Sequence, residues 1–219
     1  MEKSLIQQVK VLFLKELKIE WRQRYAINGI LLQMTTAIFI CYLSFQVIET
    51  ATWNALFWLL LLFISVNAIA KSFISERQGR LFYYHFTVDP KAVILSKLMV
   101  NVLIAFVLAG LSLFFFKFLL GGPKLNLLQF GSVAVLFAIG LSALFTLLSA
   151  ISAKSGNGNL MMPVLSFPIV IPLFMVTLSA STHILGGESL WIRDLGILAL
   201  LDTMILVLAL ILYQNLWQE

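Results

Sequence analysis

Residues 98–119 read LMVNVLIAFVLAGLSLFFFKFL, and these 22 residues decide what kind of protein this chain is. The run carries a single charged side chain, Lys117. At a rise of 1.5 Å per residue, about 20 helical residues cross the ~30 Å hydrocarbon core of a bilayer. The run is therefore predicted to be a membrane-spanning helix.

Five more apolar stretches flank this run and pass the same test. They are residues 27–48, 52–72, 128–152, 160–182 and 193–214. The 219 residues are 61% hydrophobic and 11% charged, far from the usual composition of a soluble domain. We expect an all-α, polytopic membrane protein whose six transmembrane helices and their joints form a single domain over residues 1–219, with no room for a soluble catalytic module.

The distribution of Lys and Arg predicts the orientation of the chain in the membrane. Twelve of the 15 basic residues fall on the side that would hold both termini, and three fall on the other: Lys117, Lys124 and Arg193. Cytoplasmic loops carry such an excess, so both termini are expected in the cytoplasm, with the chain in a bacterial inner membrane. The net charge of +5 then indicates anionic lipid, rather than nucleic acid, as the partner.

Residues 1–25 are predicted to form an amphipathic helix that lies in the interface. Apolar side chains share one helical face, and basic side chains lie on the other. The apolar residues are Leu5, Ile6, Val9, Leu12, Phe13 and Leu17. This helix is either a simple anchor or an elbow that moves with the first span.

Residues 73–97, between the second and third spans, form a charged and aromatic interruption. Asp89 followed by Pro90 is typical of a helix N-cap and first turn, so a helix leading into the third span is expected to begin there. The aromatic residues before it either sit in the lipid headgroups or dock onto a soluble protein. The second reading makes this segment a coupling elbow.

Polar residues and prolines mark the first and fifth spans as candidate pathway or hinge elements. Asn28 and Gln33 lie in the first span, where polar side chains need protein or water as neighbours. Pro163, Pro168 and Pro172 fall within ten residues of the fifth, and they predict a kink or local unwinding. Hydrogen bonds between helices and a fixed structural kink are the alternatives.

A small-residue stripe and one acidic residue are the remaining intramembrane features. Ala134, Ala138, Ser142 and Thr146 recur every four residues, which predicts close helix packing within the chain or across a dimer. Asp202 is the one acidic residue well inside a span. Such a carboxyl is either functional or neutral and hydrogen-bonded to Thr203 or another helix.

No motif for catalysis, nucleotide binding or metal binding is present in the sequence. It has no G-x-x-x-x-G-K-[ST] loop, and its single Cys41 falls inside a span. His85 and His183 are predicted on opposite sides of the membrane, so no shared metal site is expected. His183, at the outer end of the fifth span, is the weak candidate for a contact with haem.

Three segments resemble the haem exporter protein B (CcmB) family, the membrane subunit of an ABC-type complex in cytochrome c maturation. They are residues 15–24, which begin K-E-L-K, residues 70–102 with Glu76-x-x-Gly79, and residues 154–174 with the Pro168 and Pro172 pattern. The likeness extends over most of the chain in length and number of spans.

This resemblance implies a permease subunit that is not itself an enzyme and binds no cofactor. A separate cytoplasmic ABC ATPase would bind ATP, and a haem-handling membrane partner and a haem chaperone would act on the outer side. Two copies of the chain are expected per complex. The residues expected to couple to the ATPase are Glu76, Arg77, Gly79, Arg80 and Phe82.

The output would be haem export or release of a haem-loaded chaperone. The rival readings are an ABC-2-type permease for a lipid, polysaccharide or drug, and a membrane scaffold without transport.

Overall fold

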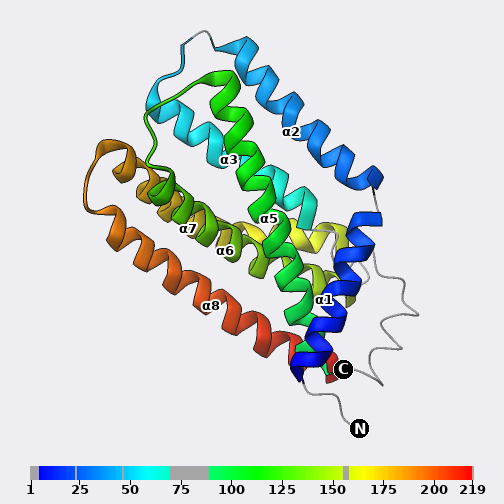
Figure 1. Ribbon diagram of the computed structural model, residues 1–219. Helices are drawn as coiled ribbons and strands as arrows, with labels where there is room; N and C mark the ends of the chain where they lie inside the picture. The colour runs from blue at the N-terminus through cyan, green and yellow to red at the C-terminus, as the bar shows by residue number, and fades with distance from the viewer. Residues whose placement is uncertain (1–4, 23, 46, 70–88, 155–157, 219) are drawn as a thin grey trace.

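The computed structural model of the chain (Figure 1) describes residues 5–22, 24–45, 47–69, 89–154 and 158–218. The described residues form α-helices and short connections, with no strand. Six of the helices are long and apolar enough to cross a membrane, which confirms the predicted all-α polytopic fold. The helices are α1 (Leu5–Arg22), α2 (Arg24–Ser44), α3 (Thr50–Ile69), α5 (Pro90–Leu120), α6 (Leu127–Lys154), α7 (Gly158–Gly186) and α8 (Trp191–Gln218).

Consecutive spans run up and down, so the bundle has two distinct ends. Both chain termini lie at one end, together with α1 and the start of α5 (Figure 1). We call this the terminal end. The connections at residues 45–49, 121–126 and 187–190 lie at the opposite end, which we call the hairpin end.

Helix α6 is the centre of the bundle. It packs against α3, α5, α7 and α8, and 72% of its membrane-spanning window is buried. Ala138, Ser142 and Thr146 of the small-residue stripe are buried within the chain. Asn101 of α5 donates a hydrogen bond to Thr146 Oγ1 at 2.8 Å. The stripe is thus used for packing inside one chain.

A cluster of aromatic side chains holds α3, α5 and α6 together near the hairpin end. Trp53 and Phe57 of α3 contact Phe116 of α5 and Phe130 of α6, with ring centroids 5.2–6.2 Å apart. Such offset and edge-to-face pairs add about 0.5–1.5 kcal/mol each to the burial of the rings. Gly122, at φ +115°, lets the connection after α5 lie directly against the Trp53 indole.

Helix α5 begins where the sequence predicts. Asp89 is its N-cap, with Pro90 in the first turn, and the Asp89 carboxylate accepts a hydrogen bond from the backbone N–H of Lys91 at 2.8 Å. The predicted third span, 98–119, therefore extends backwards by eight residues, and the last part of the predicted elbow, 90–97, belongs to this helix.

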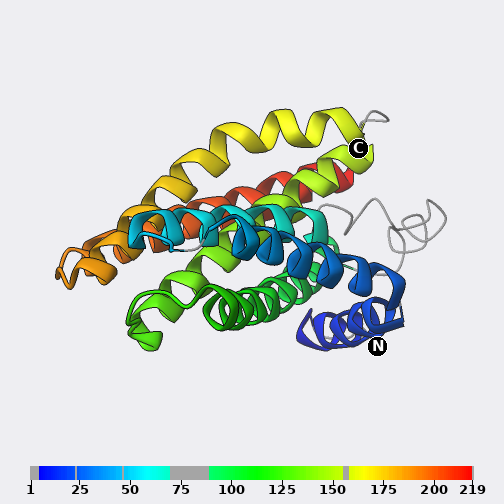
Figure 2. The ribbon, with the colours of Figure 1, turned by 90° about the horizontal axis from the view of Figure 1, so that it is seen from above.

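Helix α7 passes through all three of its prolines without interruption of the helix. Local unwinding, one of the two predicted outcomes, is therefore not observed. In Figure 2 the ribbon of α7 is bent along its length. Pro168 and Pro172 lie on its exposed face, pointing away from the bundle core.

Candidate coupling site

The predicted coupling residues Glu76, Arg77, Gly79, Arg80 and Phe82 lie outside the described residues, so their role stays a prediction. The structure does describe the two flanks of this segment. Helix α3 ends at Ile69, and α5 begins immediately after Asp89. A force on the segment therefore enters the bundle through the end of α3 and the start of α5.

Helix α1 lies against this end of α5. Leu12 of α1 joins a buried apolar cluster with Ala92, Val93 and Ile94 of α5 and with Tyr213 of α8. The sequence predicted that the apolar face of α1 would lie in lipid. This prediction is wrong for Leu12, which contacts protein, whereas Ile6 of the same predicted face is 78% exposed.

A buried ion pair joins the same two helices. Lys97 Nζ of α5 lies 3.4 Å from Glu16 Oε2 of α1, and the Lys97 side chain is only 2% exposed. Lys15 Nζ approaches the other oxygen, Glu16 Oε1, at 2.8 Å. Burial acts to raise the pKa of Glu16, but the attraction of Lys97 and the hydrogen bond from Lys15 outweigh it and hold that pKa below its usual value. Glu16 is therefore ionised at neutral pH.

The pKa of Glu20, one turn further along α1, shifts in the opposite direction. Burial and repulsion from Glu16 raise its pKa, and the attraction of Lys97 only partly opposes them. The acidic face of α1 thus concentrates negative charge around one buried ammonium group. This arrangement fixes the register of α1 against α5.

A hydrogen bond ties α1 to the residue at which α5 begins. The backbone N–H of Asp89 donates to Gln8 Oε1 of α1 at 3.0 Å. Together with the Glu16 to Lys97 pair, this contact holds the first two turns of α5 to α1. A displacement of Asp89 therefore acts on both helices.

Asp202 lies at the centre of α8 and is 2% exposed. Within the described residues, neither of its carboxyl oxygens has a hydrogen-bond partner. The Thr203 hydroxyl donates to the Leu200 carbonyl instead, so the predicted bond between Thr203 and Asp202 is not formed. An ionised carboxylate at this depth costs about 2.5 kcal/mol or more, which favours the neutral acid.

A polar cluster at the hairpin end was missed by the sequence reasoning. Asp194, which follows Arg193 at the start of α8, is 2% exposed. Its Oδ2 accepts a hydrogen bond from Ser179 Oγ at 2.6 Å and lies 2.9 Å from His183 Nδ1, while Arg193 donates to Oδ1. His183 Nε2 faces Glu188 at 3.5 Å. The cluster ties the end of α7 to the start of α8.

The candidate pathway residues lie on outer faces of the bundle. Asn28 is exposed, and so is Gln33, whose Oε1 accepts a hydrogen bond from Asn67 of α3 at 3.1 Å. Only 11% of the α2 window is buried. The side chain of Pro163 is outside the described part of the chain. Among the described residues, no group of three or more His, Cys, Asp or Glu side chains could hold a metal ion.

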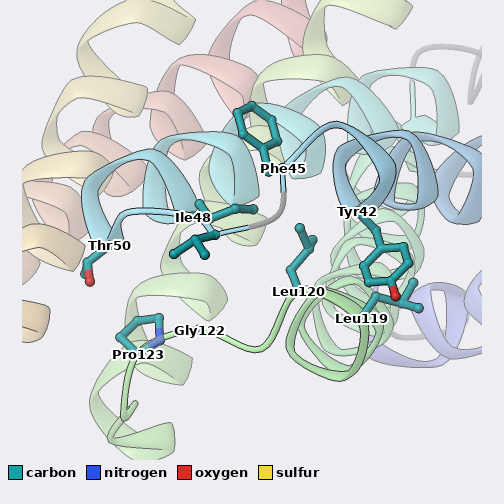
Figure 3. Close-up of a pocket in the computed structure, with 9 residues that line it drawn as sticks. Tyr42, Phe45, Ile48, Thr50, Leu119, Leu120, Gly122 and Pro123 are labelled. Carbon is teal, nitrogen blue, oxygen red and sulfur yellow. The ribbon is translucent and has the colours of Figure 1, made fainter.

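A pocket of about 400 Å³ opens at the hairpin end (Figure 3). Its walls come from the end of α2, the end of α5 and the connections that follow them. The residues that line it include Tyr42, Phe45, Ile48, Leu119, Leu120 and Pro123. The exposed surface of this pocket is more polar than apolar, although most of the residues that line it have apolar side chains.

Comparison with known proteins adds one positive finding. Residues 7–177 match the protein family described as ABC-2 type transporter. The match begins in α1 and ends within α7, so it includes the docked α1 and the start of α5. No curated protein and no solved structure matches the chain.

Proposed function

This chain belongs to the ABC-2 type transporter family, and from that premise we propose that it couples ATP hydrolysis to haem export, or to release of a haem-loaded chaperone, in cytochrome c biogenesis. Its family makes it a membrane transport subunit that works with a partner ATPase subunit. The family match over residues 7–177 is the observation that carries the transport part of this proposal.

The terminal end of the bundle supports the coupling part of the proposal. Residues 70–88 connect α3 to α5, and the first residue of the structure after them, Asp89, is bonded to α1. An ATPase that moves this segment moves α5 at its first turn. The contacts of Gln8 and Glu16 then pass the movement to α1, at the head of the first span.

The outer face of α2 supports the proposal of two copies. Asn28 and Gln33 are exposed in the first half of α2. Polar side chains at membrane depth need protein or water beside them rather than lipid. A second copy, or an aqueous cavity between two copies, supplies that environment.

The coupling role is tested by purification of the complex in mild detergent. We expect an ABC ATPase to copurify with the wild-type chain. With the triple variant Arg77→Glu/Arg80→Glu/Phe82→Ala, the amount of copurified ATPase should fall by a factor of about ten or more, because arginine and aromatic side chains dominate the binding energy of interfaces. Lys124→Glu reverses an exposed charge at the hairpin end and is the matched control.

Intact copurification and ATPase activity in the triple variant would instead favour a scaffold without transport. Either conclusion requires that the wild-type chain and the triple variant are recovered from the membrane in equal amounts.

The haem substrate is supported by the resemblance to the haem exporter protein B family. We expect a deletion strain to lose covalently haem-stained c-type cytochromes and to regain them when the full chain is supplied on a plasmid. The complex should also bring along a haem-containing membrane protein. Normal c-type cytochromes in the deletion strain would exclude this substrate.

The family match leaves the substrate open, so a permease for a lipid, polysaccharide or drug is the second candidate. A permease for such a substrate predicts an envelope or drug-sensitivity defect in the deletion strain, with c-type cytochromes unchanged.

A further inference from the structure

Asp202 is placed at the midpoint of a membrane-spanning helix. The span runs from Trp191 to Tyr213, so Asp202 is eleven residues from either end. At 1.5 Å per residue this is about 16 Å, roughly half the thickness of the hydrocarbon core. Its burial is inside the protein, because α5, α6 and α7 all pack against α8.

The carboxyl group occupies a gap that only a glycine leaves open. A Cβ built on Gly140 of α6 would collide with Asp202 Oδ1, and it would also lie 2.8 Å from Leu173 Cδ1 of α7. The carboxyl is thus pressed against the backbone of α6 beside an apolar side chain. This cradle is shaped for the carboxyl, yet no hydrogen-bond partner for either oxygen is described.

No described cation neutralises the carboxyl. The other titratable side chains on α5, α6, α7 and α8 are Lys91, Lys97, Lys117, Lys154, His183, Arg193, Asp194 and Tyr213.

These groups lie toward the helix ends, and several of them form ion pairs there. Asp194, the nearest acidic group along α8, is eight residues away, about 12 Å along the axis. Lys97 pairs with Glu16 at the terminal end, and His183 pairs with Asp194 at the hairpin end. Among the described residues of these four helices, no cation pairs with Asp202, and a proton is what neutralises it.

We propose that Asp202 is a proton-binding site of this permease, occupied while α6, α7 and α8 are packed as they are here. The proton forms the O–H bond of a neutral carboxylic acid. It passes to water when α8 separates from α6 and α7 and the carboxyl meets solvent. When the three helices pack together again, the carboxylate takes a proton back from water. This inference does not depend on the identity of the transported substrate.

Labelling with dicyclohexylcarbodiimide in native membranes tests whether the proton is present. This apolar reagent reacts with a protonated carboxyl: the acid proton moves to a carbodiimide nitrogen, the oxygen adds to the central carbon, and rearrangement leaves a stable N-acylurea. Mass spectrometry then locates the adduct. At pH 7 we expect the adduct on Asp202 of the wild type, and no adduct at this position in Asp202→Asn, which has no carboxyl there.

The dependence on pH separates proton binding from simple access of the reagent. The yield on Asp202 should be present at neutral pH and fall as the pH is raised further, because the reagent needs the protonated acid. A yield that does not change as the pH is raised, or no adduct at pH 7, would overturn the proposal.

The thermal stability of the full chain in detergent gives a second readout. If the folded chain holds a proton that the unfolded chain has lost at neutral pH, stability falls as pH rises. Asp202→Asn keeps a neutral side chain of the same shape, so this part of the slope should disappear. Equal slopes for the wild type and Asp202→Asn would contradict the proposal; if the variant does not fold, the labelling of the wild type decides it.

Discussion

Replacing Glu16 by leucine is expected to destabilise the folded chain by about 3 kcal/mol, measured by thermal denaturation of the purified chain in detergent. The substitution leaves the Lys97 ammonium buried, at 2% exposure, without the carboxylate that lies 3.4 Å from it. Loss of one partner from a buried ion pair costs about 3–5 kcal/mol. Glu20 still attracts Lys97, which places the effect at the low end of that range.

Two further variants show whether the cost comes from the buried charge of Lys97. The double variant Glu16→Leu/Lys97→Met should recover most of the loss, because an apolar pair of similar volume often replaces a buried ion pair at little cost. Lys15→Ala removes the more exposed partner and should change stability by less than about 1 kcal/mol. A double variant no more stable than Glu16→Leu would contradict the assigned role of this pair.

Gly140→Ala is expected to destabilise the chain by about 1–3 kcal/mol or more, measured in the same way. The added methyl group meets the Asp202 carboxyl and the Leu173 side chain, and insertion of one carbon into a packed core carries a cost of this size. Helix α6 must then separate from α8 or displace the carboxyl.

Gly131→Ala is the matched control for this substitution, on the same helix. A Cβ at Gly131 meets nothing within 4 Å, so the variant should be neutral or up to about 1 kcal/mol more stable, from the higher helix propensity of alanine. Equal effects of the two substitutions would show that the contact between Gly140 and Asp202 is not a packing constraint.

The features that follow from local sequence were predicted well. Each of the six spans needs only about 20 apolar residues in a row, a property that the bilayer imposes without regard to neighbouring helices. The start of α5 follows from Asp89 and Pro90, because capping depends on groups within one turn. Boundaries such as the end of the first span, predicted at residue 48 and observed at Ser44, differ by a few residues.

The features that depend on contacts between distant residues could not be predicted. Lys97 was counted as a basic residue of the cytoplasmic surface, but it is buried against Glu16, 81 residues earlier in the chain. The burial of Asp194 could not be predicted either, because its position at a span boundary does not reveal that Ser179 and His183 of α7 bind it. The cradle that Gly140 forms for Asp202 likewise appears only when α6 packs against α8.

The length of α5 has a mechanical consequence. Its 31 residues form one unbroken rod about 46 Å long, longer than the hydrocarbon core is thick. Asp89 caps one tip of this rod, and Leu119 and Leu120 at the other tip line the pocket. Because an unbroken helix tilts as one rigid body, a displacement of its first turn at Asp89 also moves Leu119 and Leu120. The wall of the pocket on the opposite side of the membrane therefore moves with it.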